Sequence, residues 1–222
     1  MIVYTTFKQA FLDALNQTGS YVVMNGYIWK SFPAPTESDL VVLMPKPQID
    51  QLCAQLSKLP MVKGITLSTR FHSAQVQINL DGQVMVNVYL VHQFIYQSLV
   101  FMDAEQVIQK RVGNQRGVQM PCIEHLFEYA VLSSLLAARG WTHTQFQYFE
   151  EFHALIKEDL IEFFNQKYAT TLVNLQGLLV FREANRRQAV QQLKDMPANR
   201  FIKTINIRWH HFMGTLRQAR II

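Results

Sequence analysis

The sequence predicts a mixed α+β fold, with a mixed sheet and flanking helices followed by a helical C-terminal half. Apolar residues stand at helical spacing near the N-terminus, change to a period of two between residues 65 and 90, and return to helical spacing after residue 103. Of the 222 residues, 49% are hydrophobic and 12% aromatic. This composition supplies a substantial core and excludes a mainly disordered chain.

The first elements are a helix and a short strand. Phe7, Phe11 and Leu15 recur at helical spacing and predict an amphipathic helix over residues 4–17, before Gly19. The β-branched and aromatic run at 21–24 then predicts a strand.

A second strand and a crossover helix follow a proline-containing loop. The apolar run at 40–44 is continuous, which is typical of a strand buried on both faces. Apolar residues from 49 to 59 then return to helical spacing and predict the crossover helix.

An antiparallel ladder comes next. Alternating apolar residues at 76–80 and 84–90 flank Asp81 and Gly82, and this dipeptide is a strong hairpin signal. Residues 99–102 are interpreted as a last strand of this first half.

The second half is predicted to be helical. A glycine-bounded turn at 113–117 precedes an apolar stripe at 123–135, and further helices are expected over 144–163 and after Pro197. The chain is therefore divided into an α/β domain at 1–102 and a helical domain at 103–222, with a ligand cleft expected between them.

Positive charge is concentrated near the C-terminus. Residues 182–222 hold nine Lys or Arg and two acidic residues, a balance of +7, so the +5 of the whole chain leaves −2 for residues 1–181. Such a basic helix is either a solvated face or a surface for nucleic acid or another anionic partner.

Composition also suggests a location. The longest uninterrupted apolar run has five residues, and no basic stretch precedes an apolar block at the N-terminus. With only two cysteines, a disulfide framework is not expected. We therefore expect a cytoplasmic protein without a transmembrane segment.

The region 21–43 carries the residues of greatest chemical interest. A short strand ends at Asn25 and Gly26, and Glu37, Ser38 and Asp39 stand directly before the buried strand. This order resembles the nucleotidyltransferase superfamily, in which a glycine-containing turn precedes an acid-x-acid pair and a third acid stands on a neighbouring strand. Over residues 1–140 the chain is similar to nucleotidyltransferase-like proteins associated with sugar and polysaccharide genes.

The resemblance implies a metal site. Side chains two apart on a strand share a face, so Glu37 and Asp39 could hold Mg²⁺ or Mn²⁺ together and serve as the catalytic acids. Asn25, Gly26 and Ser38 would contact the ligand, and Asn87 would be both a ligand contact and the third metal position. The alternative is that Glu37 and Asp39 only stabilise a solvated turn.

The acid pattern departs from the family. If Asp39 is the first acid, Val41 occupies the second position, and Asn87 stands where the neighbouring strand would carry a carboxylate. Asp81 and Asp103 are other candidates for the third acid.

We therefore expect a nucleotidyltransferase-fold protein with a degenerate metal site, which binds a nucleotide or phosphorylated sugar with weak or no transfer. The alternatives are an active enzyme that uses Glu37 and Asp39, and a basic module that binds anionic surfaces through residues 182–222.

Overall fold

The computed structural model describes residues 2–24, 40–81, 84–96, 99–113, 117–137, 158–175, 178–179, 183–196 and 199. The chain forms two compact units, each treated by itself below. The first unit contains Met1–Phe94 and Asp103–Cys122, and the second contains Ile95–Met102 and the described part of Ile123–Thr204. The mixed α+β class is confirmed, whereas the domain division at residue 103 stays a prediction.

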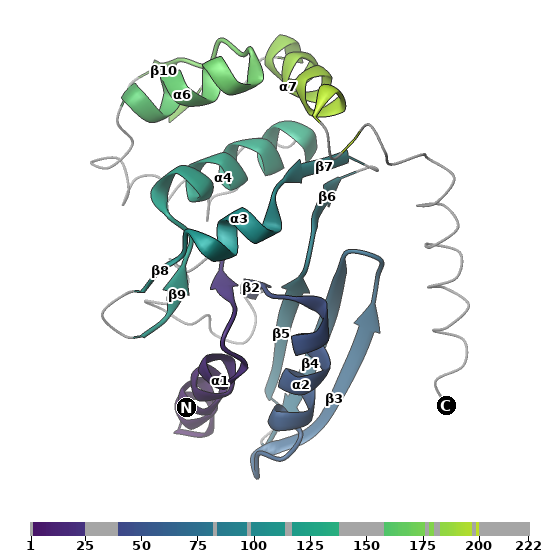
Figure 1. Cartoon of the computed structure of the whole chain (residues 1–222). Helices are drawn as coiled ribbons and strands as arrows, with labels where there is room; N and C mark the ends of the chain where they lie inside the picture. Colours follow the sequence, from purple (N-terminus) through teal and green to yellow (C-terminus); the bar gives the residue numbers. More distant parts are fainter. Residues whose placement is uncertain are drawn as a thin grey trace. The chain divides into compact units, whose positions relative to one another are not determined.

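A five-stranded mixed sheet forms the centre of the first unit (Figure 1). Its strand order is β1-β2-β5-β4-β3. Only the pair β2/β5 is parallel, and the other neighbours are antiparallel. The strands are β1 (Val22–Val23), β2 (Leu40–Leu43), β3 (Val62–Thr69), β4 (Ser73–Leu80) and β5 (Val84–Val91).

The predicted hairpin is confirmed as β4 and β5, which pair along their full length from Ser73 opposite Val91 to Leu80 opposite Val84. The strand predicted at 99–102 also exists, as β7 (Leu99–Met102), but it pairs with β6 (Phe94–Tyr96) in a separate two-stranded sheet. The existence of this last strand is therefore confirmed, and its partner is β6.

Two helices, α1 (Ile2–Thr18) and α2 (Lys46–Leu56), supply the apolar side chains that cover one face of this sheet. Alternation along β4 and β5 directs every second residue into this core. Both predicted helices and both short predicted strands are therefore confirmed. The sheet contributes to the core Val23, Leu40, Val42, Ala74, Val76, Ile78, Leu80, Val86, Val88 and Leu90.

A small hairpin and the short helix α3 (Ala104–Gln109) also belong to the described part of the first unit. The strands β8 (Val112–Gly113) and β9 (Gln119–Met120) flank the predicted turn, in which Gly117 has a φ of 73°. The hydroxyl of Tyr21 donates to Asn16 Oδ1 at 2.7 Å and accepts from the backbone N–H of Gln119 at 3.4 Å. This side chain therefore ties the residue before β1 to β9.

The second unit contains α4 (Ile123–Ala137), α6 (Glu158–Tyr168), α7 (Glu183–Asp195), β10 (Asn174–Leu175) and β11 (Leu178–Leu179). The predicted stripe at 123–135 forms α4, and α6 corresponds to the end of the predicted helix over 144–163. Residues 144–157 and the helix expected after Pro197 lie outside the described residues. The described helices include none that is both long and apolar enough to cross a membrane.

Candidate functional site

Most of the predicted site residues cannot be placed. Asn25, Gly26, Glu37, Ser38 and Asp39 all lie outside the described residues, so their convergence stays a prediction. Two segments that border them are described, namely β1 with Met24 and β2 from Leu40 onward. The remaining predicted residue, on β5, is also described, and the site is therefore built from these strands.

Asn87 lies on the strand next to β2. In the parallel pair β2/β5, Leu40 is opposite Val88, and Asn87 directly precedes Val88 in the chain. Val41 is opposite Tyr89 in the same register. The predicted third-acid strand is therefore the direct neighbour of the strand that Glu37 and Asp39 precede in the sequence.

The side chain of Asn87 lies on the sheet face away from the α1 and α2 core. Val86 and Val88 on either side of it belong to that core, and side chains alternate along a strand. The antiparallel register places Gln77 opposite Asn87 and Thr66 opposite Gln77. This row of three polar side chains crosses β5, β4 and β3.

A second row runs beside the first on the same face. It consists of Val41, Tyr89, Gln75 and Ser68, paired in sequence across β2, β5, β4 and β3. None of the residues in the two rows is charged. These two rows therefore supply no carboxylate at this end of β2.

The amide oxygen of Asn87 is buried and accepts no hydrogen bond from the part of the chain that the structure describes. Leaving a buried acceptor unsatisfied costs about 1–3 kcal/mol, so such groups usually have a ligand, ion or water as partner. A neutral amide oxygen is an acceptable ligand for Mg²⁺ and similar cations. The position thus fits one place in a metal shell, without supplying charge.

The two other candidates for a third acid have local partners. Asp81 forms an ion pair with Lys63 at 3.0 Å in the turn after β4. Asp103 caps α3 (Ala104–Gln109), where it accepts from the backbone N–H groups of Glu105 at 2.9 Å and Gln106 at 3.2 Å. Across the described ranges, no group of three or more His, Cys, Asp and Glu side chains could hold a metal ion.

A partly buried ionic cluster that the sequence analysis missed lies in the second unit. The carboxylate of Glu128 on α4 accepts from Lys167 Nζ and from the hydroxyl of Tyr168, both on α6. Burial and the adjacent Glu128 raise the pKa of the Tyr168 phenol. A signal for the cluster is present in the sequence, because Glu128 is an acidic residue within the mostly apolar buried face of α4. We interpret the cluster as a link between two helices.

Comparisons with known proteins add one structural similarity. No protein-family model matches the chain, and no curated protein matches it significantly. Among solved structures, the polymerase core of TRAMP, an RNA surveillance complex, is similar over 86% of this chain and 68% of that chain, with a TM-score of 0.34 and 12% identity. A similarity of this strength does not establish a shared function.

Proposed function

We propose that this chain is a nucleotidyltransferase-fold protein with a degenerate metal site, which binds a nucleotide or phosphorylated sugar with weak or no transfer. Two observations support the proposal. The order of glycine turn and acid pair in the sequence resembles that superfamily, and β2 lies parallel and adjacent to β5, the strand expected to carry the third metal position.

Glu37 and Asp39 would hold Mg²⁺ or Mn²⁺ in this proposal, and Asn87 would complete the shell. The cation would neutralise phosphate charge and position the reacting oxygens. Gly26 would allow the backbone to approach the phosphates closely.

The observation that carries the proposal is the amide oxygen of Asn87, which is buried beside the start of β2 and has no hydrogen-bond partner among the described residues. An amide places an oxygen where a metal ligand is needed but withholds the negative charge of a carboxylate. Disturbing even an outer partner of a metal site costs roughly 10–100-fold in affinity or activity, so a missing charge in the shell should cost at least as much. We therefore expect the chain to bind its ligand but to transfer little or no nucleotidyl group.

Calorimetric titration tests the proposal. Each nucleoside triphosphate would be titrated into the full chain with and without MgCl₂ or MnCl₂, for wild type, Asn87→Asp and Asp39→Ala. We expect weak metal-dependent binding in wild type, a gain of about tenfold or more in Asn87→Asp, and loss in Asp39→Ala. Gln77→Asn, on the neighbouring strand, is a matched amide control that should leave binding unchanged.

Two results would reject this function. One is the absence of metal-dependent binding in wild type, and the other is an Asn87→Asp variant that binds no better. Steady pyrophosphate release by wild type, abolished by Asp39→Asn, would instead support the active-enzyme alternative.

The basic-module alternative gains no support from the described part of residues 182–222. In α7, Glu183 lies 3.5 Å from the side chains of both Arg186 and Arg187. With Lys194 and Asp195, the helix has three basic and two acidic residues, a net charge of +1. Most of the local excess of positive charge therefore lies outside the described residues.

A further inference from the structure

Three chain segments converge at the carboxyl end of β5. The backbone N–H of Met44 donates to the carbonyl of Val91 at 2.9 Å, which holds the end of β2 and the start of α2 beside β5. On the other side, the N–H groups of His92 and Gln93 donate to the carbonyl of His72 at 3.1 and 3.3 Å. His92 is thus flanked by the start of α2 and by the turn between β3 and β4.

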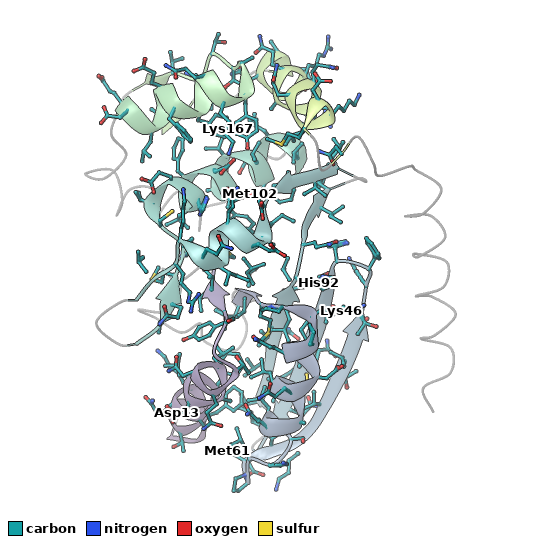
Figure 2. The ribbon with its side chains drawn as sticks, viewed as in Figure 1. Asp13, Lys46, Met61, His92, Met102 and Lys167 are labelled. Atoms are coloured by element: carbon teal, nitrogen blue, oxygen red, sulfur yellow. The ribbon has the colours of Figure 1, made fainter. Side chains whose placement is uncertain are left out.

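Cationic and imidazole side chains lie where these three segments meet. Lys46 is the first residue of α2, Arg70 and His72 belong to the β3–β4 turn, and His92 follows β5. Figure 2 shows Lys46 close to His92 at this end of the sheet. Lys46 and Arg70 are exposed, whereas the two imidazoles are partly buried, so the cluster is open to solvent on one side.

Negative charge is scarce in the described segments that form this cluster. The described segments 40–49, 67–75 and 88–96 contain no Asp or Glu. The nearest acidic residue along α2 is Asp50, one turn after Lys46. Burial lowers the pKa of His92, and the positive charges of Lys46 and His72 lower it further, against an opposing hydrogen bond with the backbone of Phe71. The site therefore has a positive potential that a bound anion would relieve.

We propose that Lys46, His72 and His92, with Arg70 at the rim, form a binding site for a phosphate group. Lysine and protonated imidazole form charge-assisted hydrogen bonds with phosphate oxygens. The site lies at the carboxyl ends of the parallel pair β2/β5, where ligands of α/β sheets commonly bind. Lys46 also lies at the N-terminus of α2, where the helix dipole favours negative charge.

The phosphate site is separate from the candidate metal position. His92 stands five residues after Asn87 on β5, which at about 3.4 Å per residue corresponds to about 17 Å. The two proposals can therefore fail independently, since one depends on Asp39 and Asn87 with a divalent cation and the other on Lys46 and His92 without one.

The test uses the full chain without divalent cations. Inorganic phosphate and glycerol 3-phosphate would each be titrated at pH 6.5 by calorimetry, at ionic strength matched with KCl, and the imidazole signals of His92 would be followed by NMR across pH. We expect binding of both probes, a rise in the pKa of His92 on binding, and at least tenfold weaker binding in Lys46→Gln and His92→Asn. Lys58→Gln, which removes an exposed lysine beyond the other end of α2, is the matched control.

The affinities of the two probes show which kind of phosphate ligand the site recognises. Similar affinities for the two probes would support recognition of the phosphate group alone, and tighter binding of the ester would support a larger phosphorylated ligand at the same site. The proposal is overturned if neither probe binds at millimolar concentration, or if Lys58→Gln weakens binding as much as Lys46→Gln, which would indicate general charge attraction. Thermal unfolding of each variant checks that the fold is kept, and Lys46→Gln alone decides the test if His92→Asn does not fold.

Discussion

Removal of the Tyr168 hydroxyl tests the interpretation of the partly buried ionic cluster as a link between α4 and α6. Tyr168 is fully buried, and its hydroxyl donates to Glu128, which is 5% exposed. In Tyr168→Phe, the ring keeps its contact with Phe164, whose centroid lies 4.6 Å away. Lys167 Nζ still reaches Glu128 at 2.5 Å. The substitution therefore removes one hydrogen bond and little else.

The expected loss follows from that single bond. A hydrogen bond to a charged acceptor contributes about 1.5–3 kcal/mol, and the remaining lysine limits the cost of leaving the carboxylate buried, so we expect a loss of about 2 kcal/mol. With a urea m-value of about 2 kcal/mol/M, the midpoint should fall by about 1 M. Tyr89→Phe, at a partly exposed position on the sheet, should change stability by less than about 0.5 kcal/mol.

Urea unfolding followed by circular dichroism measures the effect, and a double-mutant cycle with Glu128→Gln isolates the pair. If the pair interacts as described, Tyr168→Phe should cost clearly less in the Glu128→Gln background. A single-variant loss below about 0.5 kcal/mol, or an unchanged loss in that background, would refute the reasoning.

The same cluster predicts a pH dependence. Because the pKa of Tyr168 is raised in the folded chain, the unfolded tyrosine ionises first, at a pKa of about 10. The unfolded state then binds fewer protons than the folded state, so this contribution to stability is complete below about pH 10 and is lost as the pH rises above it. The loss should be smaller in Tyr168→Phe.

Three further predictions follow from the first unit. Asn87→Val removes a buried oxygen that has no partner in the described part of the chain, so it should raise stability by about 1 kcal/mol in urea unfolding while abolishing metal-dependent triphosphate binding; a destabilised variant would contradict the assignment. Burial and, to a lesser extent, Asp50 raise the pKa of Cys53 to about 11, so iodoacetamide should modify it much more slowly at pH 8 than it modifies a free thiol, and a rate equal to that of free cysteine would count against this environment. Asp103→Ala should lower stability by about 1 kcal/mol in thermal unfolding because the N-cap of α3 is lost, whereas Asp103→Asn should keep most of it.

Local sequence patterns determined the elements of the sheet unit. The period of the apolar residues distinguished α1 and α2 from the strands, and alternation along β4 and β5 identified which side chains enter the core. These signals are reliable because a residue's place on a helix or strand face depends on its near neighbours alone. By contrast, α7 was missed, since Ala189 and Leu193 are its few buried apolar residues and leave only a weak stripe.

Strand order and buried partners were decided by the tertiary structure. No local pattern states that β5 lies between β2 and β4, or that residues 99–102 pair outside the ladder. The same holds for Glu128, whose partners are about 40 residues away, and for His92, which meets Lys46 and His72 only through strand pairing. Pairing over such separations depends on which surfaces are left free once the core has formed, and a single sequence read locally does not contain that information.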